Sequence, residues 1–479
     1  MIRLYLDWNV FSYLNNLREA KEPYISLNRI LTNNKDRILI PYSSAHLTDL
    51  IPAYKKSEAS KEKTETNLSY LAELTNHRCI IYDANKKTTY PDKHDINQYF
   101  PQLLDSDQML SGDSFESLFS SIEDPEMQAM IKPFFDILKN LPVNISELIP
   151  AQSVEFPTLN NHFGAMFSGN SFYDLLNNTY KMMSDYNADP TKYRSIRNMS
   201  LDELKLSHDY TQAENPIEAI SKNMELSAFK KSFKEFADQN LKNYFKDKEP
   251  SRFDIFTNYY MQLDFLGYYR DRVFKNMLQD SFHAYYGAHC DFFVTDDDNT
   301  YHKAKVIYDY FNIETVVCKT NEFIGKFFGK VILNSKMERS LLEVISDILS
   351  NSFVLPNQYD EKFNPVNIYK PDHYILNYFN RLQLTDNIDG TKDLYLYKNS
   401  KNYSDFYFFK EVESTTNNLF KEFGPSLNSR TTYIPETETR ELAENNWAGR
   451  IWKLDNATLE LQMMENPFGL TLSIHLPGK

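Results

Sequence analysis

The sequence predicts an α/β protein in which one parallel sheet is assembled from two separated parts of the chain. Short apolar segments alternate with helical patterns near the start, and the same alternation returns after about residue 250. This alternation is typical of parallel sheets, because parallel strands need crossover connections. Between the two parts the pattern is helical, and beyond about residue 330 it changes again. We therefore expect an interrupted α/β domain followed by an α+β region.

The first part of the α/β domain carries three expected strands. An apolar run from Ile2 to Leu6 ends at Asp7, a second run covers 38–40 before Pro41, and a third covers 79–82. Helically spaced apolar residues lie between these runs. They predict helices after Asp7, near 25–31, from Ser43 or Ser44 onward, and over 57–75.

The alternation of strands and helices resumes near residue 250. Strands are expected at 292–294 and 315–318, with helices at 259–274, 277–289 and 301–310. Residues 85–249 lack the alternation and show helical patterns at 127–138, 173–183 and 216–245. We therefore expect one discontinuous domain, formed by residues 1–84 and 250–328, and a helical insertion at 85–249.

The last region, residues 329–479, is expected to be a separate α+β unit. It begins with a helical pattern near 338–349 and continues with runs at 393–397 and 405–409. Two β-rich runs at 458–463 and 470–475 flank Asn466-Pro467-Phe468-Gly469, which is typical of a hairpin turn.

The composition is that of a globular protein, and we expect it in the cytoplasm. Of the 479 residues 42% are hydrophobic and 25% are charged, a balance that does not indicate disorder. Cys79, Cys290 and Cys318 are scattered without a CxxC pair, so they predict buried thiols in a reducing compartment. The N-terminus has no basic-then-apolar signal region, and no segment approaches about 18 uninterrupted apolar residues. No membrane association is expected.

Four aspartates occupy positions where functional groups collect in parallel sheets, outside the carboxyl ends of the strands. Asp7 ends the first strand, and Asp297 is the middle one of three acids that follow the strand at 292–294. Asp49 lies one turn into the helix after the second strand, and Asp280 lies near the start of the helix before 292–294. These placements predict that the four carboxylates converge at one end of the sheet.

A convergence of carboxylates implies a cation. Clustered carboxylates repel one another, so each favours protonation unless a cation lies among them. Hard oxygen ligands suit Mg²⁺ or Mn²⁺, and such ions can activate water and stabilise the leaving oxygen in phosphodiester hydrolysis. The four acids are therefore candidate metal ligands.

The sequence around these acids resembles four motifs of the PIN-domain nucleases. Leu6-Asp7-Trp8-Asn9-Val10-Phe11 is similar to their opening strand, followed by Asp, a variable residue, Asn and an apolar residue. Residues 40–50 resemble their second motif of strand, Ser and helix. Residues 280–289 resemble the helix that begins with their third acid, and 293–297 resemble their closing strand with Thr, any residue and Asp. The likeness covers about residues 1–84 and 250–328.

This resemblance implies a PIN-like three-layer fold and a nuclease that uses Mg²⁺ or Mn²⁺. It implies an endoribonuclease, acting on RNA rather than DNA and leaving a 5′-phosphate and a 3′-hydroxyl. Asp7, Asp49, Asp280 and Asp297 are implied as catalytic residues as well as metal ligands. Two features depart from the family pattern: an Asp stands at position 49, where the family usually carries Glu, and a long insertion separates the second and third acids. The shorter acid reduces the reach of the carboxylate, and the insertion is expected to narrow substrate access.

Neighbouring polar residues are candidates for supporting roles. Asn9 and Thr295 can hydrogen-bond a carboxylate or a ligand water, with ordinary turn chemistry as the alternative for both. Ser44 is expected to cap the helix that carries Asp49. Asp296 is a further candidate for a supporting role.

The choice of fourth ligand among Asp296, Asp297 and Asp298 stays open, because Asp298 could instead cap the helix that follows.

The substrate-binding residues are harder to place, because the net charge of −14 excludes a protein coated in positive potential. A nucleic-acid partner therefore needs a local basic surface on an acidic molecule. Lys303 and Lys305 follow the last acidic motif and are the candidate substrate contacts.

Other functions remain in competition with the endoribonuclease. His46 with Asp49, and Asp280 with His283, stand three residues apart and would suit a transition-metal centre, although no third histidine motif accompanies them. A non-catalytic PIN-like scaffold, a nuclease acting on DNA, and a toxin-like or defence effector are further alternatives. A homo-oligomer or a regulatory partner is also left open.

Overall fold

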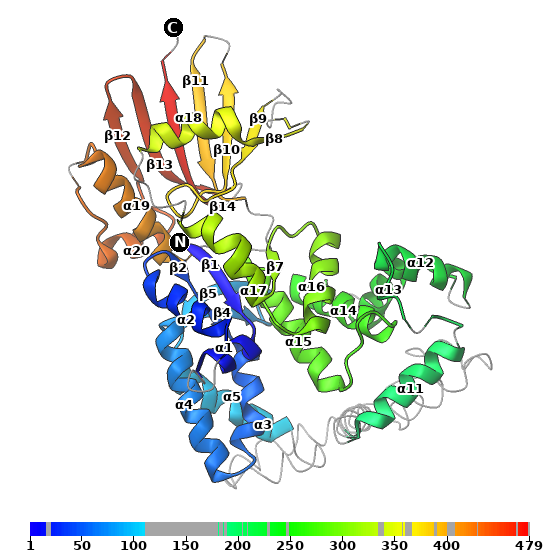
Figure 1. The fold of residues 1–479 in the computed structure, drawn as a ribbon. Coiled ribbons are helices and arrows are strands. Elements are labelled where there is room, and N and C mark those ends of the chain that lie inside the picture. Colours follow the sequence, from blue (N-terminus) through cyan, green and yellow to red (C-terminus); the bar gives the residue numbers. More distant parts are fainter. Residues whose placement is uncertain are drawn as a thin grey trace, which may run out of the picture.

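The computed structural model describes residues 1–15, 21–110, 181, 185, 189–203, 205–207, 209–227, 230–245, 249–333, 340–356, 358–359, 366–387, 390–399, 408–428, 430–465 and 468–477. The fold of this part is mixed α/β and contains a four-stranded parallel sheet. Its strands are, in order, β2 (Ile38–Leu39), β1 (Ile2–Leu6), β6 (Phe292–Val294) and β7 (Val316–Cys318). The predicted parallel sheet, built from two separated parts of the chain, is therefore confirmed (Figure 1).

Helices cover both faces of this sheet, because alternate residues of a strand face opposite sides. Leu4 of β1 lies in one hydrophobic core and Tyr5 lies in another. The core around Leu4 includes residues of α1 (Trp8–Asn15), α2 (Tyr24–Asn33), α3 (Ser44–Tyr54) and α4 (Glu58–Thr75). The core around Tyr5 includes residues of α14 (Arg252–Phe265), α15 (Phe274–Gly287) and α16 (Asp298–Tyr310). The sheet is thus the middle of three layers.

A proline separates β2 from the next strand, and the two strands belong to different sheets. β3 (Tyr42–Ser43) follows Ile40 and Pro41 and pairs in parallel with β4 (Arg78–Asp83), which pairs antiparallel with β5 (Thr88–Lys93). Proline lacks the N–H that a continuous ladder requires. The strand expected at 79–82 therefore lies in this smaller sheet and is not hydrogen-bonded to the four-stranded one.

The segment expected to be helical from residue 85 begins with strand β5, and α5 (Ile96–Leu110) then packs against α3 and α4. β5 was missed because Pro91 and its charged neighbours do not look like a strand, although proline is tolerated at the edge position that β5 occupies. The segment up to residue 110 therefore packs with elements of the first part of the chain, and the domain bounds predicted at residues 84 and 85 stay a prediction.

Within the insertion the described helices are α11 (Pro190–Glu203), α12 (Pro216–Leu226) and α13 (Phe233–Phe245). The helical pattern expected over 216–245 is two helices and not one. The expected helices at 127–138 and 173–183 lie outside the described residues, apart from position 181.

The helix expected at 259–274 ends early, at Phe265. Gly267, with φ +107°, donates its N–H to Asp264, and the Tyr268 N–H donates to the Leu263 carbonyl, at 3.1 and 2.9 Å. Two such bonds around a left-handed residue form a Schellman ending, which glycine favours. A turn therefore separates α14 from α15, and it carries Asp271 and Arg272.

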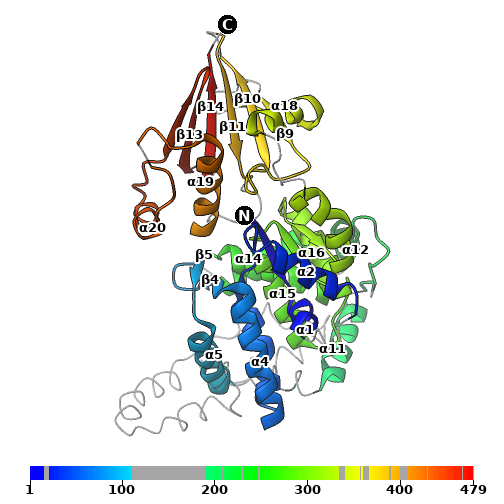
Figure 2. The same ribbon diagram turned by 60° about the vertical axis from the view of Figure 1, so that its left-hand side comes forward.

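The C-terminal region contains a seven-stranded antiparallel sheet in the order β12-β13-β14-β11-β10-β9-β8. The strands are β8 (Phe353–Leu355), β9 (Asn367–Lys370), β10 (Arg381–Asp386), β11 (Lys392–Tyr397), β12 (Arg450–Leu454), β13 (Ala457–Glu465) and β14 (Phe468–Leu476). Helices α18 (Leu341–Asn351), α19 (Phe409–Phe423) and α20 (Pro435–Ala443) share a core with the sheet (Figure 2). The expected runs at 393–397, 458–463 and 470–475 are strands. In the run expected at 405–409, Phe408 precedes α19 and Phe409 begins it, and 405–407 lie outside the described residues.

A short helical segment links the two regions. α17 (Thr320–Glu322) continues into a π-helix, η1 (Phe323–Leu333), after β7. Within the described residues no helix is long and apolar enough to cross a membrane.

Arg3 joins β1 to the C-terminal region through buried charges. Its Nε and Nη2 donate to the two carboxylate oxygens of Glu411 at 2.9 and 2.7 Å, and its backbone N–H donates to Asp291 at 2.7 Å. Lys398 Nζ donates to Asp291 and Glu411 at 2.9 and 3.3 Å. Burial favours the neutral form of Glu411, but Arg3 and Lys398 outweigh it and lower the pKa of Glu411 to about 2. The two regions therefore share one desolvated charge network.

Replacing Glu411 with alanine should destabilise the whole chain. The substitution leaves Arg3 and Lys398 buried without this carboxylate, and removing one partner of a buried ion pair typically costs about 3 to 5 kcal/mol. We expect that loss in the free energy of unfolding, measured by urea denaturation of the full chain. Glu413→Ala is the matched control on the same helix, since Glu413 pairs with Lys410 near the surface and should cost less than about 1 kcal/mol. Equal losses in the two variants would contradict the role of Glu411.

Candidate active site in an acidic pocket

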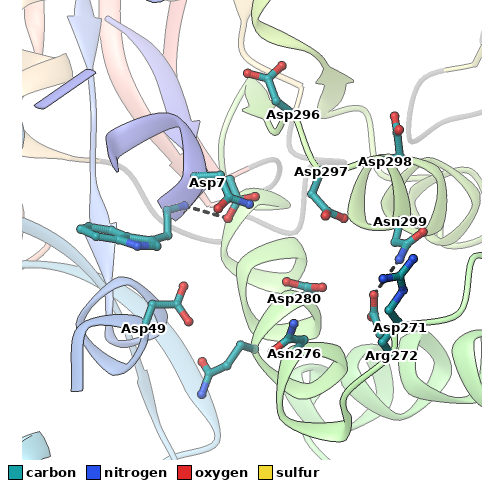
Figure 3. Close-up of a pocket in the computed structure, with 13 residues that line it drawn as sticks. Asp7, Asp49, Asp271, Arg272, Asn276, Asp280, Asp296, Asp297, Asp298 and Asn299 are labelled. Atoms are coloured by element: carbon teal, nitrogen blue, oxygen red, sulfur yellow. Dashed lines mark hydrogen bonds between the residues drawn. The ribbon is translucent and has the colours of Figure 1, made fainter. Parts of the chain in front are cut away.

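A pocket of about 620 Å³ lies where β1 and β6 end (Figure 3). All four predicted acids line it, so the structure brings together Asp7, Asp49, Asp280 and Asp297. The remaining lining residues are Trp8, Asn9, Asp271, Arg272, Asn276, Gln279, Asp296, Asp298 and Asn299. Seven of the thirteen are aspartates and one is an arginine, so the pocket carries a strong negative charge and attracts cations.

Asp7 is held by hydrogen bonds from both sides of its carboxylate. The Thr295 hydroxyl donates to Oδ2 and the Trp8 N–H donates to Oδ1, both at 2.7 Å. Burial raises the pKa of Asp7, and the nearby charges of Asp49 and Asp297 act in the same direction. The hydrogen bond from Thr295 opposes that shift. Such a contact is expected of a residue that supports a metal-ligating carboxylate.

Of the three consecutive acids after β6, Asp297 is the one that points toward Asp280 in Figure 3. It is also the N-cap of α16 and accepts the Thr300 N–H at 2.7 Å. Asp296 turns away and accepts hydrogen bonds from the Tyr24 hydroxyl at 2.8 Å and the Thr320 hydroxyl at 2.6 Å.

Asp298 is the first residue of α16 and pairs with Lys319, so the expectation that it could cap this helix is wrong. Among the three acids, the orientation therefore favours Asp297 as the pocket ligand.

Asp280 lies in the middle of α15, because this helix begins at Phe274 and not close to the acid as expected. The positive end of the helix therefore does not explain an acid at this position. Burial of the carboxylate raises its pKa well above the ordinary value, and repulsion from Asp271 adds to the shift, while Lys303 opposes it. The surroundings of Asp280 therefore compensate its negative charge poorly.

Asp49 pairs with a histidine from another helix. His283 Nε2 donates to Asp49 Oδ2 at 2.9 Å, and His283 Nδ1 lies 3.9 Å from Asp7 Oδ1. Burial favours the neutral ring, but the hydrogen bond to Asp49 and the charges of both aspartates raise the pKa of His283 above its ordinary value. The spacing of Asp280 and His283 marked this residue, but its partner lies across the tertiary structure and not along its own helix.

His46 is engaged with the backbone on both ring nitrogens. Its Nε2 donates to the Leu6 carbonyl at 2.7 Å, and Nδ1 accepts the Ser43 N–H at 3.0 Å. Burial lowers the pKa of His46 well below its ordinary value, so the ring is neutral. Across the described ranges no three His, Cys, Asp or Glu side chains are grouped closely enough to hold a metal ion as they stand. With both ring nitrogens engaged, His46 is not placed to act as a ligand of a transition-metal centre.

Two of the residues expected to support the acids are placed differently from Thr295. Ser44 is the first residue of α3, and the N-cap is Ser43, so the expectation that Ser44 caps this helix is wrong by one residue. The Ser44 hydroxyl lies 3.1 Å from the Tyr286 hydroxyl. Asn9 is exposed and lines the pocket.

Neither lysine expected to contact substrate reaches the pocket. Lys303 is fully buried and donates to Asp264 and Asp271 at 2.8 and 2.5 Å, so it neutralises one acid that lines the pocket, Asp271, and another that does not, Asp264. Lys305 is exposed, lies beside Tyr301 and lines a separate pocket of about 250 Å³. Both lysines lie on α16, more than one turn after Asp297, which is the N-cap of this helix. They therefore lie away from the edge of the sheet where the pocket forms.

Sequence reasoning missed several polar residues of the pocket. Asp271 and Arg272 lie in the turn between α14 and α15, a segment that was expected to be helical. Asn276 and Gln279 lie on α15 before Asp280. Asn299 donates to Asp271 at 2.9 Å. The Leu266-Gly267 pair is the sequence signal that could have placed the turn, and with it Arg272.

Searches of protein families, curated proteins and solved structures find no match to this chain.

Replacing Asp280 with asparagine should stabilise the protein at neutral and alkaline pH in the absence of divalent cations. Because the folded-state pKa is raised, stability is greatest when Asp280 is protonated and falls as the pH rises through that pKa. Asparagine removes the ionisation, so at pH 8 we expect a melting temperature higher by roughly 2 to 4 °C, equivalent to about 1 kcal/mol. The gain should be smaller at pH 5, closer to the ordinary pKa of an aspartate, because less of the cost of ionising Asp280 has been incurred there.

Asp36→Asn makes the same change at an exposed acid and should alter stability by no more than about 0.5 kcal/mol at either pH. A gain for Asp280→Asn that is the same at pH 5 and pH 8, or a loss at both, would contradict the uncompensated charge.

Proposed function

We propose that this protein is a divalent-metal-dependent nuclease that hydrolyses phosphodiester bonds in RNA. One observation carries the proposal: Asp7, Asp49, Asp280 and Asp297 come from four separate segments and line one pocket at the carboxyl ends of parallel strands. Ligand sites of open parallel sheets form at such an edge. The resemblance of the surrounding motifs to the PIN-domain nucleases supports the same activity.

The donor set of the pocket fits Mg²⁺ or Mn²⁺. It offers carboxylate and amide oxygens, which are the ligands these hard ions prefer. The raised pKa values of Asp7 and Asp280 indicate carboxylates whose charge lacks a sufficient counterpart within the protein. When bound, such an ion would activate water and stabilise the leaving oxygen of the phosphodiester. Mg²⁺ usually binds one or two carboxylates and keeps waters and substrate phosphate as its other ligands, so a closely grouped set of protein ligands is not required.

The chain's own residues would hold the reacting groups. Thr295 fixes Asp7, and the Thr300 N–H fixes Asp297, so both carboxylates are oriented before any ligand arrives. Arg272 is the cationic side chain that lines the pocket and suits a phosphate oxygen. The amides of Asn276 and Gln279 can bind sugar or base edges beside it. An acidic pocket with so little positive charge binds phosphate only together with cations, which makes activity dependent on metal.

The nuclease is tested by metal-dependent cleavage of single-stranded RNA by the full chain. We expect cleavage with Mg²⁺ or Mn²⁺, none with excess EDTA, and a fall in kcat of about 100-fold or more for Asp7→Asn, because several kcal/mol of charge stabilisation are lost. Asp36→Asn, at an exposed acid that does not line the pocket, should keep the wild-type rate. Single-stranded DNA of the same sequence, assayed in parallel, decides between RNA and DNA. Undiminished activity in EDTA, or in Asp7→Asn, would overturn the proposal.

A non-catalytic PIN-like scaffold is the second candidate function. The observation that favours it is the pairing of Asp49 with His283, together with the lack of a preassembled metal-ligand group in the described residues. Calorimetric titration of the full chain with Mn²⁺ separates the two. Binding that is lost in Asp280→Asn supports the nuclease, and no binding to the wild type supports the scaffold.

A further inference from the structure

We propose that His283 is a positioning residue for Asp49, which it holds in the pocket through Nε2 while Tyr5 holds His283 in turn. This inference rests on the proposed function, because it concerns how one of the four acids is presented to a metal ion. Under this inference His283 orients the carboxylate of Asp49, and Tyr5 orients the ring of His283 from behind the site.

The contacts place His283 behind Asp49 and not in the pocket itself. Nε2 lies 2.9 Å from Asp49 Oδ2, and the His283 side chain is 1% exposed, against 22% for Asp49. Asp49 lines the pocket and His283 does not. His283 therefore acts through Asp49, and it is not placed to touch a substrate.

The direction of the hydrogen bond does not depend on the protonation of the ring. An ionised carboxylate only accepts hydrogen bonds, so Nε2 carries the hydrogen whether the imidazole is neutral or charged. On the other side of the ring, Nδ1 lies 3.0 Å from the Tyr5 hydroxyl, which lies 2.7 Å from the Ser43 hydroxyl. Both ring nitrogens are engaged, and the plane of the ring is fixed.

These contacts join three of the segments that carry the acids. Tyr5 stands two residues before Asp7 on β1, so the two side chains share one face of the strand. Ser43 precedes α3, the helix of Asp49. His283 lies one turn after Asp280 on α15. A displacement of any one of these segments would strain the Tyr5–His283–Asp49 chain, so the chain sets the separation of the acids.

The hydrogen bond also selects one orientation for a short side chain. Asp49 has one methylene fewer than the Glu of the motif it resembles, and without His283 its partly exposed carboxylate would be free to rotate toward solvent. The bond engages Oδ2, which leaves Oδ1 for a ligand in the pocket. A residue that orients a metal ligand in this way typically contributes about 10- to 100-fold to metal affinity.

A double-mutant cycle between His283 and Asp49 tests the inference, with Mn²⁺ alone as the probe and calorimetry of the full chain as the readout. We expect His283→Leu to weaken Mn²⁺ binding by about 10- to 100-fold. In an Asp49→Ala background the same change should alter affinity by no more than about twofold, since the residue it positions is already absent. His283→Gln keeps an N–H donor and should recover part of the affinity, and Tyr5→Phe should weaken binding less than His283→Leu.

His289→Gln is the matched control for the loss of a buried histidine near the end of the same helix, and it should leave Mn²⁺ affinity unchanged. Circular dichroism identifies variants that fail to fold. If His283→Leu does not fold, Tyr5→Phe replaces it in the double-mutant cycle with Asp49→Ala. Equal losses from His283→Leu with and without Asp49 would overturn the inference and leave the proposed function standing. Absence of Mn²⁺ binding to the wild type would overturn both.

Discussion

Burial of β1 is the constraint on which the rest of the structure depends. Every residue of this strand is buried, yet it carries a charged Arg3 near its start and is followed by the buried carboxyl group of Asp7. A buried charge is tolerated only when it is paired and hydrogen-bonded. Glu411 and Asp291 meet this demand at one end, and Thr295 and the chain through His283 meet it at the other. The C-terminal region and the acidic pocket are thus attached to opposite ends of one strand.

The charges at the two ends of β1 are balanced to different degrees. Arg3 has charged partners at hydrogen-bond distance, and the pKa of Glu411 is lowered accordingly. In the pocket the balance is reversed, because Asp7 and Asp280 favour protonation even though Lys303 and His283 lie nearby. Lys303 is committed to Asp264 and Asp271, and His283 to Asp49. Protein charges therefore stabilise the wall of the pocket and leave its interior undercompensated, an arrangement that costs stability and is typical of a site built for a ligand.

How far the sequence predicts this molecule depends on whether a feature is local. Apolar runs and helical spacing predict β1, β6, β7 and most helices around them, because burial on both faces requires those patterns. Asp7 and Asp297 were predicted from their positions after strands, and Asp49 and Asp280 from their positions in the adjoining helices, which are also local properties. β5, the bond between His283 and Asp49, and the burial of Lys303 depend on tertiary packing, over separations that range from 32 residues for Lys303 and Asp271 to 234 residues for Asp49 and His283. No spacing along a helix or strand encodes such contacts.

The pairing of Arg3 with Glu411 also determines when β1 can be stabilised while the chain is being synthesised. The two residues are 408 positions apart, so at about 5 to 20 residues per second a ribosome needs roughly 20 to 80 s to pass from one to the other. β1 lacks β6 until residues 292–294 are made, and Arg3 lacks Glu411 for the whole interval, so the buried charge of this strand is matched late. The N-terminal strand, although made first, is therefore fully paired only after much of the following chain. A nascent chain consequently cannot assemble the acidic pocket before Asp297 has been made, and Arg3 gains Glu411 later still.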